Sequence, residues 1–349
     1  MNKISVLIPS YNHAQWINQA VDSVLTQTYQ NIEVIIVDDC STDNSQSVIK
    51  ELAKNDSRII YKLLPENIGA VLAMKEAFLL SSGEYVATIS SDDIWDIGKL
   101  QKQIEILENS NYGAVFTKVN FVNQCGKAKK KQKNMFNIPK EINIQNRDNI
   151  LRFFALRGNF LCHPSVLIKK ECYLECGFYD PRFRSLPDFD FWVRLLFKYN
   201  ISIIDEPLVN FRIHTYNESG ESNINNLKRC MYEHACILLT YFSNIITIQQ
   251  LKGIFPIESV FIKIEDDRLT QFYLSQIFLQ NGGIPQKHCA LNQMFKLLQN
   301  KTLTDLLFQH KLYSYTQYSK DIEQSNIHRI RPKKIKRFLK NIAIALGIS

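Results

Sequence analysis

The chain of 349 residues is long enough for one large domain with a smaller one, or for two domains of ordinary size. Its apolar content of 45% allows a real hydrophobic core and excludes global disorder. No apolar run approaches the roughly eighteen residues that span a bilayer, and the apolar stretch near the N-terminus is too short for a secretory signal. We therefore expect a cytoplasmic protein without a membrane-spanning helix.

The formal net charge of +8 is concentrated in two short segments. One reads KAKKKQK at 127–133, and the other reads HRIRPKKIKRFLK at 328–340. Because the rest of the chain is close to neutral, the excess does not describe a nucleic-acid-binding face, and no nucleic acid is expected as a partner. The eight cysteines form no CxxC pair and have no zinc spacing, so we expect free thiols in a reducing compartment.

The first third of the chain alternates between two kinds of apolar pattern. Continuous apolar runs predict buried strands at 4–9, 33–38, 58–64 and 83–90. Apolar stripes of helical spacing predict helices at 14–28, 41–54, 70–80 and 98–109. Strands separated by helices predict an α/β fold with a mostly parallel, Rossmann-like sheet flanked by helices.

The pattern is mixed from 113 to 214 and changes again near 221. Strands are expected at 113–122 and 164–170, helices at 147–157 and 187–199, and two strand pieces between 201 and 214. Beyond 221, apolar residues recur at helical spacing with few strand-like runs. The sequence therefore predicts one domain over 1–221 and a helical C-terminal region over 222–349.

Polar residues follow three of the predicted strands. Pro9-Ser10-Tyr11-Asn12 follow the first strand, Asp38-Asp39 the second and Asp92-Asp93 the fourth. Each group alone is compatible with a turn or a helix cap. Ligands of such sheets bind at the carboxyl ends of the strands, so the coincidence of all three groups predicts a binding site at that edge.

The motifs ISVLIPSYN, IIVDDCSTD, ENIGA, GEYVATISSDD, CGFYD, PDFDFWVRL and FRIH, in this order, resemble the family 2 glycosyltransferases with the GT-A fold. The likeness covers about residues 1–220. Members of this family transfer a sugar from a nucleotide-sugar to an acceptor hydroxyl, usually with inversion. The resemblance therefore implies that 1–221 is an inverting catalytic domain.

The element Ser91-Asp92-Asp93 resembles the DxD element of the family, with Ser91 at a position that is often acidic. The resemblance implies that Asp93 ligates Mn²⁺ or Mg²⁺ and that Asp92 faces the ribose or the metal. A hard divalent ion bridges carboxylate and phosphate oxygens and neutralises the charge that develops on the leaving diphosphate.

The resemblance also assigns nucleotide contacts. Asp39 would accept a hydrogen bond from the base, which favours a UDP donor because uracil N3–H is a donor, and Asp38 would lie near the ribose. Tyr11 is expected to pack on the base, or else to be an aromatic residue at the edge of the core. The implied nucleotide-binding set is Pro9, Ser10, Tyr11, Asn12, Asp38, Asp39 and Asp92.

Two further positions of the motifs carry implied roles in the reaction. Asp188 is the implied catalytic base that takes the proton of the acceptor hydroxyl, although Pro187 stands where many members have an acid. A helix N-cap is the alternative role for Asp188. Arg212 and His214 share one face of an extended segment, and the resemblance places both at the diphosphate.

The last residues, KKIKRFLKNIAIALGIS, have an apolar side with lysines elsewhere, which predicts a helix on an anionic membrane surface. A solvated or self-packed tail is the alternative.

The leading hypothesis is a metal-dependent hexosyl- or N-acetylhexosaminyltransferase that builds a surface polysaccharide or lipid-linked oligosaccharide, bound peripherally to the cytoplasmic face of the inner membrane. One alternative is a sugar-nucleotide nucleotidyltransferase, which would need a Gly-rich basic loop where this chain has PSYNHAQW. Another is a non-catalytic membrane- or nucleic-acid-binding protein on the same fold.

Overall fold

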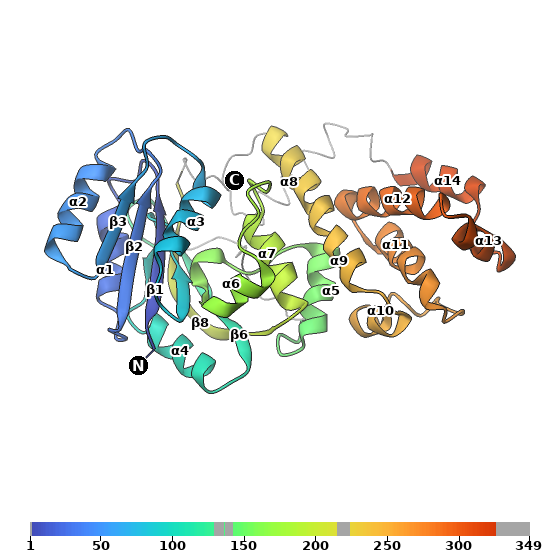
Figure 1. The fold of residues 1–349 in the computed structure, drawn as a ribbon, viewed down its shortest axis with the longest axis horizontal. Helices are drawn as coiled ribbons and strands as arrows, with labels where there is room; N and C mark the ends of the chain where they lie inside the picture. Colours follow the sequence, from blue (N-terminus) through green and yellow to red (C-terminus); the bar gives the residue numbers. More distant parts are fainter. Residues whose placement is uncertain (1, 129–135, 137–141, 215–223, 326–349) are drawn as a thin grey trace. The chain divides into compact units, whose positions relative to one another are not determined.

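The computed structural model describes residues 2–128, 136, 142–214 and 224–325 (Figure 1). The described residues form two compact units: 2–128, 136 and 160–214 in the first, and 142–159 and 224–325 in the second. The predicted division at 221 places 142–159 in the first domain, whereas the structure groups this segment with the second unit. The basic segment at 328–340, and most of the one at 127–133, lie outside the described residues.

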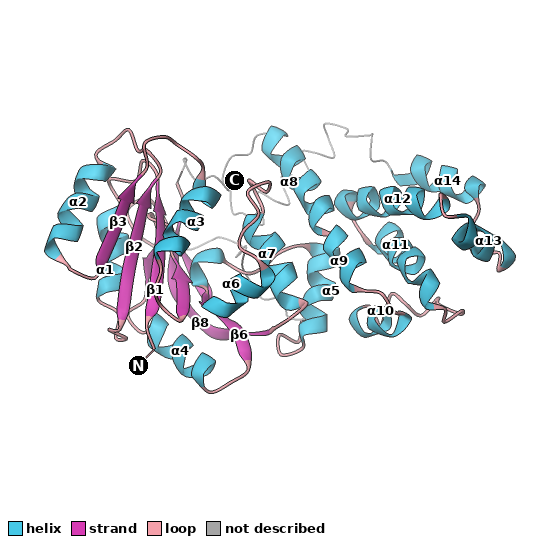
Figure 2. Ribbon diagram, in the orientation of Figure 1, coloured by secondary structure: helices cyan, strands magenta, loops and turns pink. Residues whose placement is uncertain are grey.

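The first unit is built on one eight-stranded sheet with the order β3-β2-β1-β4-β7-β6-β8-β5. The strands of this sheet are magenta in Figure 2. Strands β1 to β4 run parallel to one another, β6 is parallel to β8, and β7 and β5 pair antiparallel with their neighbours. The strands are β1 (Ile4–Ser10), β2 (Ile32–Asp38), β3 (Ile59–Leu63), β4 (Tyr85–Thr88), β5 (Ile94–Trp95), β6 (Tyr112–Val122), β7 (Leu167–Lys169) and β8 (Asn200–Arg212). The mostly parallel α/β sheet of the prediction is confirmed.

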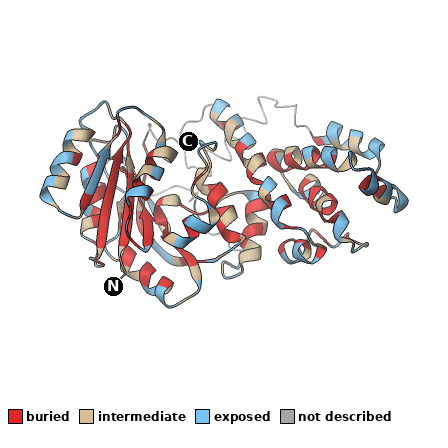
Figure 3. Cartoon of the chain, viewed as in Figure 1, coloured by how far each residue is buried: buried red, intermediate tan, exposed pale blue. Residues whose placement is uncertain are grey.

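Helices cover both faces of this sheet. They are α1 (Ile17–Leu25), α2 (Ser45–Asn55), α3 (Ala70–Leu80), α4 (Lys99–Glu108), α6 (Lys170–Cys176) and α7 (Pro187–Leu196). Alternate residues of β1 and β2, such as Val6 and Val34, join one apolar core with residues of α1, α2 and α4. Helix α3 packs against β1 and β2 on the opposite side from α1 and α2 (Figure 1). The central strands are therefore buried on both faces, as Figure 3 shows.

Three details of the first unit differ from the predicted elements. The helix expected from 41 begins at Ser45, because residues 41–43 are held in a loop by contacts with the chain after β1. The two strand pieces expected between 201 and 214 form one strand, β8, with irregular register against β6. Strand β5 and helix α6 were not predicted, since neither is long enough to show a period.

All of the regular secondary structure in the described part of the second unit is helical. Its α-helices are α5 (Arg147–Arg157), α8 (Ile224–Ile237), α9 (Leu239–Asn244), α10 (Ile248–Ile254), α11 (Thr270–Asn281), α12 (Ile284–Leu298), α13 (Lys301–Gln309) and α14 (Tyr315–Ser325). Helix α5 is anchored there by the Arg152–Glu258 ion pair and by the Tyr241 hydroxyl, which donates to Leu151 O at 2.8 Å. Among the helices that the structure describes, none has the length and apolar character that crossing a membrane requires.

A buried carboxylate connects β2 to neighbouring segments of the first unit. Glu33 Oε1 accepts from Ser5 Oγ and from Ser82 N, both at 2.6 Å, and Oε2 lies 2.5 Å from Lys3 Nζ. Burial alone would raise the pKa of Glu33, but the hydrogen bonds from Lys3, Ser5 and Ser82 outweigh it and lower the pKa to about 2.

Replacing Glu33 with Ala should lower the free energy of unfolding by about 2 kcal/mol at pH 7, since buried donors lose their acceptor. The pKa of this carboxyl is depressed by folding, so its contribution is complete above pH 4.5 and is lost as pH falls from 4.5 toward 2. Chemical denaturation of the two proteins at several pH values measures this difference. Equal stability at pH 7 would contradict the assignment.

Candidate active site

All of the predicted site residues lie in the first unit, and the segments at the ends of β1, β2 and β4 lie at one edge of the sheet. Ser10 and Asp38 are register partners at the carboxyl ends of β1 and β2. The main chain continues this pairing, because Asp39 N donates to Ser10 O at 2.8 Å. Strand β4 is the other neighbour of β1, and Asp92 lies in the loop that follows it.

The loops after β1 and β2 are tied together by Asn12. Its backbone adopts φ 55°, which asparagine tolerates better than most residues. Its side-chain Oδ1 accepts from the N–H groups of Thr42 and Asp43, and its own N–H donates to Ser41 Oγ at 2.8 Å. The contacts of Asn12 therefore shape the loops around the candidate nucleotide site.

The two adjacent acids at the end of β2 are both buried, and each is held by a different segment. Asp38 accepts from Ser41 N at 2.9 Å, Ser41 Oγ at 2.6 Å and Gln46 Nε2 at 3.1 Å, so it caps its own loop. Asp39 accepts from Ile68 N at 2.7 Å and from Gly69 N at 2.9 Å. Asp39 is thus oriented by the ENIGA segment before α3.

Two residues after Pro9 differ sharply in their surroundings. Ser10 is buried, and its hydroxyl makes no hydrogen bond to the described protein atoms. Tyr11 is 45% exposed, so it is not part of the core edge. A buried hydroxyl without a protein partner next to an exposed aromatic ring is an arrangement that a polar ligand with a planar ring can satisfy.

Gly69 has φ 89° and ψ 152°, a conformation that is essentially restricted to glycine. A Cβ at this position would meet nothing within 4 Å, so the conformation alone requires glycine.

Gly69→Ala should therefore cost roughly 1–3 kcal/mol of strain and displace the N–H that orients Asp39. We expect weaker nucleotide binding in calorimetric titrations with UDP. Unchanged affinity would show that Asp39 is not part of the nucleotide site.

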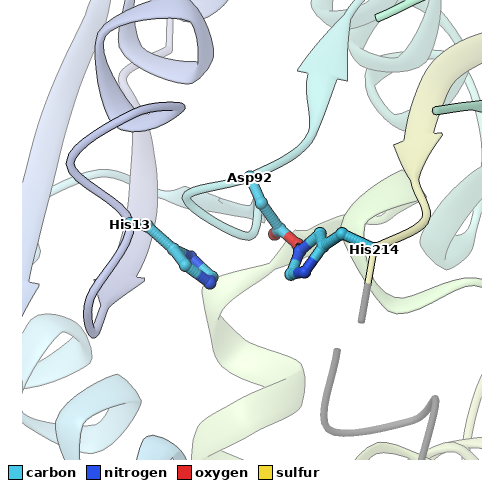
Figure 4. Close-up of side chains that lie close together, drawn as sticks. All are labelled: His13, Asp92 and His214. Carbon is cyan, nitrogen blue, oxygen red and sulfur yellow. The ribbon is translucent and has the colours of Figure 1, made fainter. Parts of the chain in front are cut away.

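His13, Asp92 and His214 come together from three separate segments (Figure 4). One potential ligand atom from each residue lies within 4.8 Å of the other two. His214 Nε2 is 2.8 Å from Asp92 Oδ2, and His13 Nδ1 is 2.7 Å from Ser91 Oγ. Burial lowers the pKa of His13, although nearby Asp92 opposes this shift. Two imidazoles and one carboxylate at this spacing form a group that could hold a divalent metal.

The adjacent acid, Asp93, has different surroundings from Asp92. Its Oδ1 accepts from Arg212 N at 2.8 Å, while its Oδ2 is buried without a hydrogen bond to described protein atoms. Burial and the Asp92 carboxylate raise the pKa of Asp93 well above its ordinary value. The resemblance implied Asp93 as the metal ligand, whereas the structure brings Asp92 into the group with the two histidines.

Arg212, which the resemblance places at the diphosphate, has several protein partners in the structure. Its side chain is buried, and it donates to Asp92 O at 2.6 Å, Gln124 O at 2.7 Å and Gln19 Oε1 at 2.7 Å. The guanidinium is thus engaged with the protein. His214, two residues further on, contacts Asp92.

Asp188 lies inside the first turn of α7, which begins at Pro187, so it is not the N-cap residue. Desolvation raises the pKa of Asp188 to about 6, although backbone N–H groups oppose the shift. Burial also raises the pKa of the Cys162 thiol, and the charges of Asp93 and Asp188 add to that effect. The charges of Asp93 and Asp188 therefore both raise the pKa of the same buried thiol.

Neighbouring aromatic side chains fix the position of α7. Trp192 packs edge-on against Phe116 of β6, with ring centroids 4.9 Å apart. Phe191 stacks on Tyr173 of α6 with ring centroids 4.6 Å apart. A helix packed in this way holds Asp188 on a rigid support.

Two residues of the site were missed by sequence reasoning. His13 directly follows the PSYN segment, so its place after the first strand was a signal that could have found it. Trp16 stacks on His214 with ring centroids 4.1 Å apart. Its position in an apolar helical stripe gave no indication of this contact.

This fold, with polar residues from several segments at the carboxyl edge of the sheet, is that of a GT-A glycosyltransferase. The family model for glycosyl transferase family 2 matches residues 5–172. TuaG of Bacillus subtilis strain 168, described as a candidate teichuronic acid biosynthesis glycosyltransferase, is 32% identical over 221 residues, which make up 63% of this chain and 82% of TuaG. The chain belongs to glycosyltransferase family 2.

Longer relatives and solved structures extend this comparison. An uncharacterized glycosyltransferase of Rickettsia felis is 28% identical over 309 residues, which cover 87% of this chain but 47% of the relative. The chain thus spans about half the length of that relative.

Residues 1–349 of S. aureus TarS in complex with UDP match with a TM-score of 0.55 and 17% identity, over 82% of this chain and 83% of that one. The mannosyltransferase PcManGT from Pyrobaculum calidifontis, in complex with GDP-Man and Mn²⁺, matches with a TM-score of 0.53 and 16% identity, over 99% of this chain and 87% of that one. At these identities the two structures show a shared fold.

Proposed function

We propose that this protein transfers a hexosyl or N-acetylhexosaminyl group from a UDP-sugar to an acceptor hydroxyl, with inversion and with the help of a divalent cation. The observation that carries the proposal is the convergence of His13, Asp92 and His214 at the carboxyl edge of the sheet. Membership of glycosyltransferase family 2 supports this reading over a nucleotidyltransferase or a non-catalytic binding protein.

His13, Asp92 and His214 would hold the cation. Two imidazole nitrogens beside one carboxylate suit Mn²⁺ better than Mg²⁺, which prefers oxygen ligands. When bound, the cation supplies Lewis-acid stabilisation of the charge on the departing diphosphate. The Mn²⁺ in the PcManGT complex is consistent with this choice.

Asp39, Ser10 and Tyr11 are proposed to bind the nucleoside. The backbone N–H groups of Ile68 and Gly69 fix the Asp39 carboxylate, and a carboxylate oxygen has a second lone pair that can accept from uracil N3–H. Ser10, whose hydroxyl has no partner among the described residues, accepts at its main-chain O from Asp39 N at 2.8 Å, and the exposed ring of Tyr11 follows it. The UDP and UDP-GlcNAc complexes of TarS support a UDP donor.

Asp188 is proposed as the general base. Its pKa of about 6 leaves the carboxylate ionised at neutral pH and close enough to neutrality to take a proton efficiently from the acceptor hydroxyl. Removing this proton makes the acceptor oxygen a better nucleophile toward the anomeric carbon. Attack from the face opposite the diphosphate inverts the configuration of that carbon.

The acceptor is proposed to be a surface polysaccharide or a lipid-linked glycan. The described role of TuaG in teichuronic acid biosynthesis is the support for this class of acceptor. We propose that 1–221 is the catalytic domain, that the helical region 222–349 is an appendage, and that the basic tail binds the cytoplasmic face of the membrane.

Deleting 329–349 should move the protein from the membrane pellet to the soluble fraction, because each basic residue contributes about 1 kcal/mol at an anionic surface. Unchanged partitioning would contradict this role of the tail.

A panel of nucleotide-sugars, assayed for release of free nucleotide with an acceptor extract, tests the proposed activity. We expect release from a UDP-sugar that requires Mn²⁺ and stops when EDTA is added. Release from GDP- or dTDP-sugars alone would contradict the UDP assignment. Full activity in EDTA would contradict the role of the cation.

A further inference from the structure

Arg212 links the end of β8 to the loop that carries the two acids after β4. Its N–H donates to Asp93 Oδ1 at 2.8 Å, and its Nε–H donates to Asp92 O at 2.6 Å. The residue is 1% exposed, so these bonds form away from water. Two residues later, His214 reaches Asp92 Oδ2. The position of Asp92 is therefore set from its main chain by Arg212 and from its side chain by His214.

The far end of the same guanidinium holds a tight turn at 123–126. It donates to Asn123 O at 3.3 Å and to Gln124 O at 2.7 Å, while a third bond reaches Gln19 Oε1 on α1. The turn is closed by Gly126 N donating to Asn123 O at 2.9 Å. Only arginine offers planar donors in enough directions to bind several carbonyl oxygens from different segments at once.

Trp16 completes this arrangement from the start of α1. Its indole Nε1–H donates to Gln124 O at 3.2 Å, the same oxygen that Arg212 uses. Its ring stacks on His214, with centroids 4.1 Å apart at 28°, and meets His13 edge-on at 5.2 Å. The tryptophan therefore contacts both imidazoles of the candidate metal group while the turn fixes its own orientation.

We propose that Arg212, Trp16 and the turn 123–126 form a clamp that positions His214 and Asp92 and so sets the affinity of the site for a divalent cation. Arg212 and Trp16 are positioning residues in this account, since they act through the ligands and do not touch the cation. The proposal rests on the metal site of the proposed function. In this proposal Arg212 acts through Asp92, which is a role separate from the diphosphate contact that the resemblance implies.

The physical basis is preorganisation. A ligand set binds a metal tightly when its members already stand in the required orientation, and loss of one supporting contact typically costs 10–100-fold in affinity. In this protein the imidazole of His214 is held on one face by a ring, and the main chain of Asp92 is held by a buried charge. Releasing either contact leaves the ligands present but less firmly held in the orientation that binds the cation.

The test is a titration of the full chain with Mn²⁺ alone, followed by electron paramagnetic resonance, which detects free Mn²⁺. The variants are Arg212→Lys, Trp16→Leu and Trp16→Phe. Arg58→Lys is the matched control, because this arginine donates to Asp56, Gln30 and Leu25 in the same unit, away from the three proposed ligands. Thermal denaturation identifies variants that do not fold.

We expect Arg212→Lys and Trp16→Leu to weaken Mn²⁺ binding about 10-fold or more. Trp16→Phe should recover part of the affinity because it keeps an aromatic ring on His214, and Arg58→Lys should keep the affinity of the unsubstituted chain. If Arg212→Lys does not fold, the two Trp16 variants decide the question. Unchanged Mn²⁺ affinity in folded Arg212→Lys or Trp16→Leu protein would overturn the clamp alone. Failure of the unsubstituted chain to bind Mn²⁺ would overturn the metal site and the clamp together.

Discussion

Replacing Asp188 with Asn should reduce turnover by roughly 10²–10⁴-fold, the usual contribution of a general base. Asparagine keeps the shape of the side chain but cannot take the proton of the acceptor hydroxyl. Binding of UDP should be unchanged, because the proposed nucleotide contacts come from other segments of the chain. Steady-state kinetics measure the first effect, and calorimetric titration with UDP measures the second.

Asp190 provides the matched control for this variant. It lies in the same turn of α7, and its Oδ2 accepts from Arg194 Nε at 2.9 Å, so its carboxylate has a structural partner. Asp190→Asn should lower stability through the loss of this ion pair while retaining transfer in the folded fraction. Near-normal turnover of Asp188→Asn, or equal losses in both variants, would show that Asp188 is not the base.

The pH dependence of the reaction offers a separate check on the same residue. A general base must be ionised to accept a proton, so kcat/KM should be level above pH 6 and fall about tenfold per pH unit below it, following the Asp188 pKa of about 6. Asp188→Asn should lose this limb of the profile and leave a low, flatter residual rate. An acidic limb that persists in Asp188→Asn would assign the titration to another group.

Asp92→Asn is expected to abolish the stimulation of transfer by Mn²⁺. The substitution removes the only carboxylate of the three-residue group that the described structure brings together. Loss of a direct ligand should cost more than the 10–100-fold that loss of a supporting contact costs. The measurements are Mn²⁺ affinity and the dependence of the rate on Mn²⁺ concentration.

Asp93→Asn serves as the comparison for Asp92→Asn. An amide oxygen at this position can still accept from Arg212 N, which is the bond that Asp93 Oδ1 makes in the structure. Asp93→Asn should therefore retain most of the Mn²⁺ affinity. If Asp93→Asn loses Mn²⁺ binding and Asp92→Asn keeps it, the assignment implied by the resemblance is right and the cluster of Figure 4 is not the metal site.

The sequence predicted the sheet well where strands are buried on both faces. The central strands β1 and β2 are continuous apolar runs because helices cover both of their sides, and such runs are distinctive. Strand β5 has two residues and gains its place only by pairing with β8, a contact far away in the sequence. A local sequence pattern does not predict a pairing between strands that are far apart in the sequence.

The sequence indicates where on the sheet the candidate site lies more clearly than it indicates the role of each residue in it. The carboxyl ends of the strands were located correctly, because strand order in a parallel sheet brings them together. Adjacent acids in a turn point in different directions, and the choice between Asp92 and Asp93 depends on which one meets Arg212 N and which one meets His214. These contacts join residues more than a hundred positions apart, so the sequence alone could not order them.

The packing of the helices in the second unit could not be predicted from the sequence. Helical spacing predicted its secondary structure, and helices α8 to α14 account for most of 224–325. Amphipathic spacing does not encode which helices pack together. The grouping of α5 with these helices depends on contacts such as Gln286 Nε2 donating to Ala155 O at 2.7 Å.

Crystals grown with UDP and MnCl₂, measured at the manganese absorption edge, test the central claim most directly. We predict one anomalous peak bounded by His13, Asp92 and His214, in contact with the diphosphate of UDP. A peak coordinated by Asp93 without the two histidines, or UDP bound with no manganese at this edge of the sheet, would contradict the account.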